Sequence, residues 1–132
     1  MEPRKILALL FAVNLVNYVD RQIVYALLPL IKADLGVSDA RLGALASAFM
    51  LVYMCAAPPI GYLADRSSRP RWISWGVAVW SVATFFSGFC RTYAQLFLAR
   101  AAVGIGESCY GSVSPSFVAE HFPPERRGRV LA

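Results

Sequence analysis

Charged residues are scarce in this sequence. Lys, Arg, Asp and Glu make up 16% of its 132 residues, whereas hydrophobic residues make up 58%. A soluble domain of this size needs a polar surface over its core, and this composition cannot supply one. We therefore expect an integral multi-pass membrane protein whose immediate partner is the lipid bilayer.

Signals for catalysis and for cofactors are also missing. The three cysteines (Cys55, Cys90 and Cys109) stand far apart without metal or redox spacing, so we interpret them as small packing residues and expect no metal site. No Ser-His-Asp set or phosphate loop occurs, and the Gly104-x-Gly106 pair lacks a preceding strand. The net charge of +5 does not indicate a nucleic-acid partner, because the basic residues lie at the ends of apolar runs. We expect neither an enzyme nor a bound cofactor.

Four apolar segments are long enough to cross a bilayer, which takes about 20 residues. Ser38 or Asp39 is a plausible N-cap for the second of them. The connections are short, so the sequence predicts an all-α, polytopic membrane bundle with antiparallel neighbours, in which residues 1–132 form part of one domain. The predicted spans are residues 6–31, 42–64, 72–90 and 93–119.

The basic residues predict the orientation. Eight Lys and Arg residues lie in the N-terminal segment, the loop between spans 2 and 3 and the C-terminal segment, and three lie in the other two connections. Loops rich in Lys and Arg stay on the cytoplasmic side. We therefore predict a protein of the cell (inner or plasma) membrane with both termini in the cytoplasm.

Four charged residues interrupt the apolar segments. Asp20 and Arg21 lie in the first span, and Arg100 and Glu107 lie in the fourth. Their positions predict that Glu107 is near the middle of the bilayer, Asp20 and Arg21 are ~3–5 Å outward of it, and Arg100 is about 9 Å outward. Charges at this depth are costly and usually mark a substrate or ion pathway. Asp20 and Arg21 are about 100° apart around the helix, so we expect one to meet span 4 and the other to face a cavity.

Polar residues extend this cluster along the first span. Asn14, Tyr18 and Arg21 follow an i, i+4, i+7 pattern with Asn17 beside them, which predicts a polar stripe. Gly104 lies between the two charges of the fourth span and leaves room for a partner helix or a substrate. The predicted substrate and proton site comprises Asn14, Asn17, Tyr18, Asp20, Arg21, Arg100 and Glu107.

Small residues recur at i, i+4 spacing in the second and fourth spans. In lipid, such pairs let helix backbones approach closely, so we expect them to serve ordinary bundle packing. The pairs are Gly43 and Ser47, Ala57 and Gly61, and Gly104 and Ser108.

A static ion-pair lock between two helices is one interpretation of the buried charges. Ion pairs in a low dielectric often add little net stability, so we favour a functional interpretation. Burial disfavours the charged form of a carboxylate and a nearby Arg favours it. A balance of the two lets the carboxylate exchange a proton as a cavity opens to either side, and the released Arg can hold an anionic substrate.

The sequence thus predicts a secondary active transporter driven by a transmembrane ion gradient of protons. The alternative is a non-transporting four-helix membrane scaffold or subunit partner. Its buried charges would then be assembly contacts.

Two segments resemble a known family. Residues 61–71, Gly-Tyr-Leu-Ala-Asp-Arg-Ser-Ser-Arg-Pro-Arg, resemble the loop signature of the major facilitator superfamily, G-x-L-a-D-r-x-G-r-[KR]. Arg100-x-x-x-Gly104-x-Gly106-Glu107 resembles its fourth-helix signature. The run Asn17-Tyr-Val-Asp-Arg and the absence of the usual loop glycine, replaced by Ser68, are similar to the Spinster-like group. The anion:cation symporter group is the close rival.

The resemblance implies the N-terminal part of a major facilitator fold, four of its twelve transmembrane helices, with the remaining helices as partners. In such a fold spans 1 and 4 are equivalent helices of two inverted repeats, and the substrate site lies near the midplane. Arg69 would pair with Glu120 in a latch that stabilises the outward-open state. The implied substrates are lysolipids and sphingolipid-like molecules, or organic anions. The implied cytoplasmic gate comprises Gly61, Asp65, Arg66, Arg69, Arg71 and Glu120.

Overall fold

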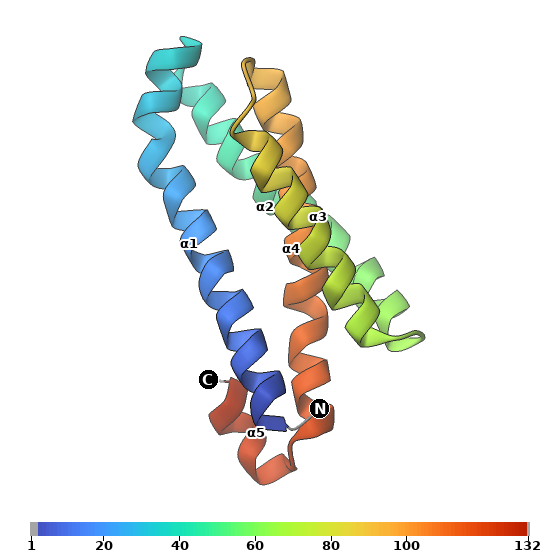
Figure 1. Cartoon of the computed structure of the whole chain (residues 1–132). Coiled ribbons are helices and arrows are strands. Elements are labelled where there is room, and N and C mark those ends of the chain that lie inside the picture. The colour runs from blue at the N-terminus through green and yellow to red at the C-terminus, as the bar shows by residue number, and fades with distance from the viewer. Residues whose placement is uncertain (1–2, 132) are drawn as a thin grey trace.

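The chain folds into a bundle of helices. The computed structural model describes residues 3–131, and every regular element in that range is a helix. Helices α1 to α4 run alternately up and down, and the short α5 lies at the same end as the start of α1 (Figure 1). The predicted all-α bundle is confirmed. The helices are α1 (Pro3–Leu35), α2 (Asp39–Asp65), α3 (Arg69–Ser87), α4 (Tyr93–His121) and α5 (Pro124–Leu131).

Local sequence signals set the turns at one end of the bundle. Gly36 has a φ of 60°, a left-handed conformation that glycine adopts without steric cost, and it ends α1. Ser38 caps α2 by accepting a hydrogen bond from the Arg41 amide at 3.4 Å. Thr92 caps α4 in the same way, accepting from the Gln95 amide at 3.3 Å. Short capped turns keep consecutive helices antiparallel.

Helix α3 is displaced by three residues from the predicted range 72–90. It begins at Arg69 because Ser68 adopts the extended N-cap conformation and Pro70 suits the first helical turn. It ends at Ser87 because the Gly88 amide donates a hydrogen bond to the Phe85 carbonyl, three residues earlier, at 3.3 Å. The other three long helices extend a few residues beyond their predicted ranges.

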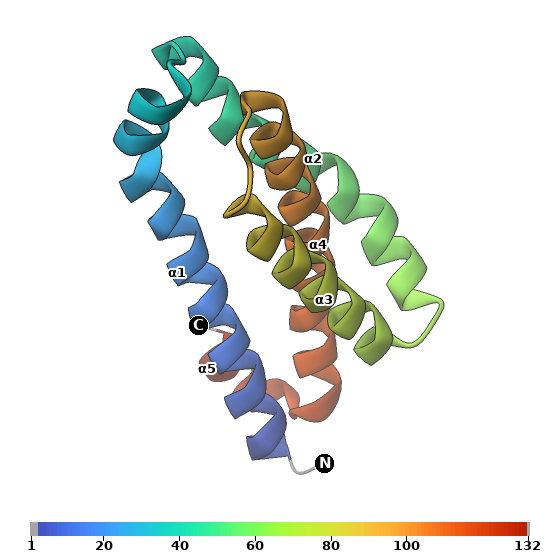
Figure 2. The ribbon, with the colours of Figure 1, turned by 45° about the horizontal axis from the view of Figure 1, so that its top comes forward.

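Helix α4 is the centre of the bundle. Helices α2 and α3 pack along it closely, whereas α1 touches α4 and α2 at few points and stands apart from the other three (Figures 1 and 2). Gly76 and Gly106 allow α3 and α4 to cross at backbone contact, since a Cβ at Gly106 would lie 2.7 Å from the Gly76 carbonyl oxygen. Gly104 does the same for α2, because its Cβ would lie 2.8 Å from the Phe49 carbonyl oxygen.

Two other glycines do not have the packing role that we predicted. Gly43 and Gly61 were expected to allow close helix approach, each with a small residue one turn away. A Cβ at either position would meet nothing within 4 Å in the described chain. The prediction is therefore wrong within these helices, because both glycines lie on faces of α2 that no described helix covers.

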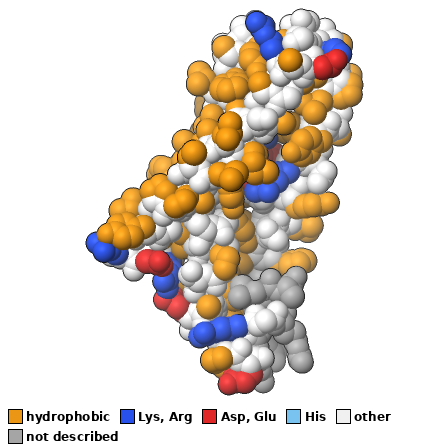
Figure 3. Space-filling model, turned by 180° about the vertical axis from the view of Figure 1, so that it is seen from behind, with side chains coloured by type: hydrophobic (Ala, Val, Ile, Leu, Met, Phe, Trp, Pro, Cys, Tyr) orange, Lys and Arg blue, Asp and Glu red, His pale blue; other side chains and the backbone are white. Residues whose placement is uncertain are grey.

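The surface is largely apolar. Hydrophobic side chains cover much of the face shown in Figure 3, with Lys and Arg gathered at its ends and in a small group at mid-height. By length and composition, Lys5–Leu35 and Asp39–Asp65 could each cross a membrane. Helices α3 and α4, which we also predicted as spans, do not meet the same length and composition test among the described residues.

The basic segments lie toward one end. The start of α1, the α2–α3 connection and α5 are at the end opposite to the α1–α2 and α3–α4 turns (Figures 1 and 2). Arg4, Arg126 and Arg129 enter the predicted charge count, but their side chains lie outside the described part of the chain. Cytoplasmic termini stay a prediction.

Candidate functional site

An ion pair joins α1 to α4 near the middle of both helices. Arg21 Nε donates to Glu107 Oε2 at 2.7 Å, and Arg21 Nη2 lies 2.5 Å from the same oxygen. The Glu107 side chain is fully buried, whereas that of Arg21 is 37% exposed. The Arg21 guanidinium also lies over two rings of α2, 5.1 Å from the Phe49 centroid and 5.6 Å from that of Tyr53. Arg21 therefore has both an acidic partner and an aromatic one.

Asn17 completes the surroundings of Glu107. It is 7% exposed, and its amide lies beside the Glu107 carboxylate. Asn17 Nδ2 and Glu107 Oε1 are both buried without a hydrogen-bond partner among the described residues. Unsatisfied buried polar atoms are unusual and often occur at functional sites.

The ion pair lies at a cavity between α1 and α4, which we call the inner cavity. Its volume is about 650 Å³, and it extends from Arg21 and Glu107 toward the α5 end. The predicted stripe of Asn14, Tyr18 and Arg21 lines it, as does Asn17. Its apolar walls include Leu7, Leu10, Phe11, Leu15 and Val118. The cavity thus combines an ion pair, of which only Glu107 is buried, with a hydrophobic lining.

Asp20 faces helix α3 and not the cavity that we expected. It accepts hydrogen bonds at Oδ2 from Trp80 Nε1 and Thr84 Oγ1, both at 3.1 Å, on α3. We had predicted that whichever residue of the Asp20–Arg21 pair did not meet span 4 would face the cavity. The correction follows from helix geometry, because α3 packs beside α4 and the 100° step from Arg21 directs Asp20 toward α3.

Arg100 is buried and forms no ion pair with another described residue. It is 6% exposed, and its Nε has no hydrogen-bond partner among the described residues. Two carboxylates, those of Asp20 and Glu107, lie near enough to attract the positive charge of Arg100, and the attraction to Asp20 is the stronger of the two. The four charges predicted for the bilayer interior therefore lie near one another, but only Arg21 and Glu107 touch.

Several residues at this site were missed from the sequence. Phe49, Tyr53, Trp80 and Thr84 contact Arg21 or Asp20, and Tyr110 ties α4 to α1 by donating from its hydroxyl to the Leu10 carbonyl at 2.6 Å. The aromatic residues look like ordinary core or lipid-facing residues. The sequence signal available for this contact was a pair of hydrogen-bond donors spaced i, i+4 in an apolar span, Trp80 and Thr84.

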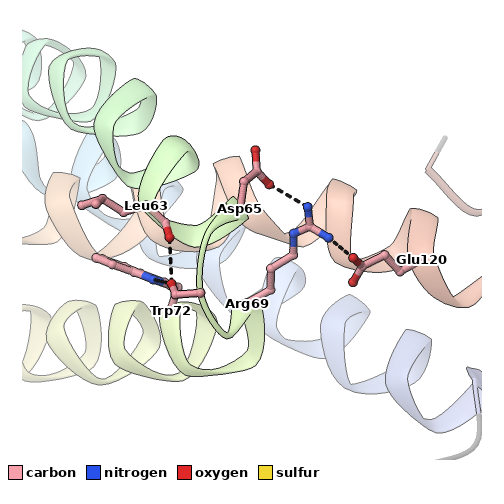
Figure 4. A network of polar contacts seen from close by, with 6 residues as sticks. Leu63, Asp65, Arg69, Trp72 and Glu120 are labelled. Atoms are coloured by element: carbon pink, nitrogen blue, oxygen red, sulfur yellow. Dashed lines mark hydrogen bonds and ion pairs between the residues drawn. The ribbon is translucent and has the colours of Figure 1, made fainter.

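A second polar network lies where α2, α3 and α4 approach one another (Figure 4). Arg69 Nη2 lies 2.6 Å from Asp65 Oδ1, and Arg69 Nη1 binds Glu120 Oε1. The hydrogen bond to Asp65, followed by that to Glu120, raises the pKa of Arg69. Arg69 thus joins the ends of three helices, in the arrangement that the loop resemblance implies.

The α2–α3 connection is held by further contacts. Trp72 Nε1 donates to Ser67 Oγ at 2.7 Å, and Ser67 Oγ donates to the Leu63 carbonyl at 2.7 Å (Figure 4). Arg66 lies 4.2 Å from the centroid of the Tyr62 ring.

The other residues of the predicted gate are less engaged. Arg71 is exposed and makes no ion pair within the part of the chain that the structure covers. Gly61 faces open space. No group of three His, Cys, Asp or Glu residues that could hold a metal ion occurs among the described residues.

Helices packed around an apolar-walled cavity with buried charges define a membrane transporter fold. Residues 10–132 match the Major Facilitator Superfamily, and the chain belongs to that superfamily. It is 39% identical over 129 residues to protein spinster homolog 1 of Xenopus tropicalis, a match covering 96% of this chain and 24% of that protein. It is 36% identical over 120 residues to protein spinster of Drosophila melanogaster, covering 91% and 20%. It is also 39% identical over 121 residues to the sphingosine-1-phosphate transporter SPNS2 of Danio rerio, covering 90% and 24%.

A comparison with solved structures leads to the same group of proteins. The fold matches a bacterial homologue of the human lysosomal transporter Spinster, in an inward-facing and unoccupied conformation, with a TM-score of 0.89 and 30% identity. The match covers 98% of this chain and 27% of that one. The predicted resemblance to the Spinster-like group is confirmed, and the chain spans about a quarter of the length of these relatives.

Proposed function

We propose that this chain supplies the N-terminal helices of a secondary active transporter that couples an amphipathic anionic substrate to a proton gradient. The observation that carries the proposal is the ion pair between the buried Glu107 and the partly exposed Arg21, at one end of the inner cavity. Ion pairs inside membrane proteins commonly mark substrate and proton pathways.

The geometry suggests how the two events are linked. A proton that binds a Glu107 carboxylate oxygen removes its charge and weakens the ion pair. Arg21 then keeps the rings of Phe49 and Tyr53 as neighbours, so its cation stays at the cavity. In this position Arg21 can bind the acidic headgroup of a substrate by charge-assisted hydrogen bonds.

The lining of the cavity supports an amphipathic substrate. Arg21 and Asn17 suit a headgroup, and Leu7, Leu10 and Phe11 suit a hydrocarbon chain. The similar SPNS2 protein is a sphingosine-1-phosphate transporter, which handles a molecule of this kind. We therefore propose a lysolipid or sphingolipid-like substrate. Small organic anions, which lack the tail, are the second candidate class.

The remaining parts of the proposal concern the gate and the membrane. We propose that Arg69, Asp65 and Glu120 hold the cytoplasmic ends of three helices together in the outward-open state. The transporter would lie in the cell membrane with the α5 end in the cytoplasm, and further helices would close the inner cavity.

Gradient-driven uptake tests the proposal. The complete transporter is reconstituted in proteoliposomes, and uptake of a lysolipid and of an organic anion is followed under an imposed pH gradient. Glu107→Gln and Asp20→Asn should each reduce driven uptake at least tenfold. Asp39→Asn is the matched control, because it breaks the exposed Lys32–Asp39 pair of 2.6 Å and should leave uptake unchanged. Undiminished coupling in both buried variants would remove the mechanism.

The size of the native polypeptide tests the scaffold alternative. An antibody against residues 1–21 should detect a band severalfold larger than the 14.5 kDa of this chain. A single band at 14.5 kDa would favour the scaffold.

A further inference from the structure

A second cavity lies on the other side of the charged layer. This outer cavity has a volume of about 310 Å³ and is enclosed by residues of α1, α2, α3 and α4. Asp34 of α1 lines it near the α1–α2 turn, and Arg100 of α4 lines it toward the middle of the bundle. It extends from the charged residues toward the end opposite to the inner cavity.

The outer cavity reaches Asp20 through a single side chain. Thr84 lines the cavity, and its Oγ1 donates to Asp20 Oδ2 at 3.1 Å. Ser87, one turn closer to the end of α3, adds a second hydroxyl to the same wall. A polar path therefore leads from the outer end of the bundle to the Asp20 carboxylate.

Water in this cavity would give Arg100 a hydrogen-bond partner that the described residues do not supply. The Arg100 side chain is more than nine-tenths buried, and its Nε is unpartnered within the described chain, although a buried charge needs hydrogen-bond partners. A water molecule occupies about 30 Å³ in the liquid and is held by two to four polar groups. The outer cavity can hold several, with Arg100, Thr84 and Ser87 as their partners.

A constriction separates the two cavities. Between them is a pocket of about 30 Å³ lined by both Arg21 and Arg100, with Leu45 and Phe49 in its wall. Arg21 also lines the inner cavity, and Arg100 also lines the outer one. Two guanidinium groups at a narrow point oppose the passage of protons between the cavities. Glu107 thus lines the inner cavity, whereas Asp20 is joined to the outer cavity through its hydrogen bond with Thr84.

We propose that the outer cavity is a hydrated path by which protons reach Asp20 from the side of the membrane opposite to the one that the inner cavity faces. The inference rests on the proposed function and adds a route for protons separate from that of the substrate. A proton arriving through the water binds a carboxylate oxygen of Asp20, forming an O–H bond and removing its charge.

Charged groups from several helices surround Asp20. Helix α4 presents Arg100 and Glu107, and α1 itself presents Arg21 and, at the mouth of the path, Asp34. Helix α3 presents the donors Trp80 and Thr84, and α2 contributes the apolar Leu45 to the wall.

Cysteine labelling tests whether the path is hydrated. In the complete transporter with Cys55, Cys90 and Cys109 replaced, Thr84→Cys and Ser87→Cys are treated from the outer side with membrane-impermeant 2-sulfonatoethyl methanethiosulfonate. Thiolate formation needs water, so both should react at least tenfold faster than Val82→Cys, which lies on the same helix but does not line the outer cavity. Two positions are used in case one variant fails to fold.

A transport assay tests whether the path serves protons. Thr84→Val keeps the shape of the side chain but removes the hydroxyl, and it should slow pH-driven uptake at least fivefold. Substrate exchange at equal pH on both sides should be slowed less than driven uptake.

The outcomes separate the two proposals. Absence of labelling at both cysteines, with intact pH-driven uptake in the wild type, would overturn the path and leave the proposed function standing. Labelling without any pH dependence of wild-type uptake would overturn the proton role and the coupling. Equal effects of Thr84→Val on driven uptake and on exchange would assign Thr84 a structural role and overturn the proposal.

Discussion

Gly76 and Gly106 face each other where α3 crosses α4, with no side chain between the two backbones. The crossing places Trp80 against α4, since a Cβ at Gly106 would lie 2.5 Å from the Trp80 amide nitrogen. The same crossing allows Trp80 to donate to Asp20 on α1. The position of the half-buried Asp20 carboxylate therefore depends on two glycines in other helices.

Gly106→Ala should destabilise the bundle by about 1–3 kcal/mol, the usual cost of forcing an extra methyl into a packed core. Both neighbours are backbone or Cβ atoms and cannot move aside. The measurement is the midpoint of thermal unfolding of the complete transporter in detergent. Gly43→Ala is the control, because a Cβ there meets nothing within 4 Å, and an equal drop in both variants would contradict the packing account.

Gly111→Ala should be destabilising for a reason that a second substitution can relieve. A Cβ at Gly111 would meet the Tyr53 hydroxyl. Tyr53→Phe removes that oxygen and keeps the ring beside Arg21, so the double variant should recover most of the lost stability. A double-mutant cycle should give a coupling energy of about 0.5–3 kcal/mol, and strictly additive effects would refute the contact.

Arg69→Gln should loosen the junction of α2, α3 and α4, because Asp65 and Glu120 lose their shared partner. Distances between spin labels at Tyr62 and His121 should become longer and more broadly distributed. Arg71→Gln is the control: it also removes one positive charge, but Arg71 makes no ion pair among the described residues, so the label distances should change little.

The label distances across the Arg69 network should depend on salt concentration and not on mildly alkaline pH. Its hydrogen bonds to Asp65 and Glu120 raise the pKa of Arg69, so its charge is fully present below the ordinary pKa of Arg and is lost only above that value. The label distances should be constant from neutral to mildly alkaline pH. Added salt should lengthen them, because exposed ion pairs are screened. Lengthening at mildly alkaline pH would contradict this assignment.

Tyr110→Phe should weaken the attachment of α1. The hydroxyl bond to the Leu10 carbonyl is one of few links between α1 and α4, and its loss should cost about 0.5–1.5 kcal/mol. Hydrogen exchange of amides near Leu10 should then rise selectively. Unchanged exchange there, with faster exchange in α3, would argue against a local link.

The sequence predicted the helices and the charged layer well. Long apolar runs give the spans, and Asp20, Arg21, Arg100 and Glu107 are conspicuous because charges are rare in such runs. The partner of Asp20 was mispredicted, since the choice between α3 and a cavity depends on how α3 lies against α4. That arrangement follows from Gly76 and Gly106, whose contact joins distant parts of the sequence.

The packing roles of glycines were predicted less well. The i, i+4 spacing of Gly43 and Gly61 with small residues is the same as that of Gly104 with Ser108, and only Gly104 meets another helix closely within the described chain. Spacing along one helix does not say which face a neighbour covers. The aromatic residues around Arg21 were missed for the same reason.

The contacts of α1 have a consequence for biosynthesis. Asp20 is held by residues 60 and 64 positions later in the chain, and Arg21 by a residue 86 positions later. When the first helix leaves the ribosome, none of these partners has been made, and each charge at the bilayer centre costs about 2.5–3.5 kcal/mol on insertion. The first helix therefore relies on the insertion machinery, or on pairing between its own neighbouring charges, until Glu107 emerges. A nascent chain stopped before Glu107 would hold this helix less firmly in the membrane than one stopped after it.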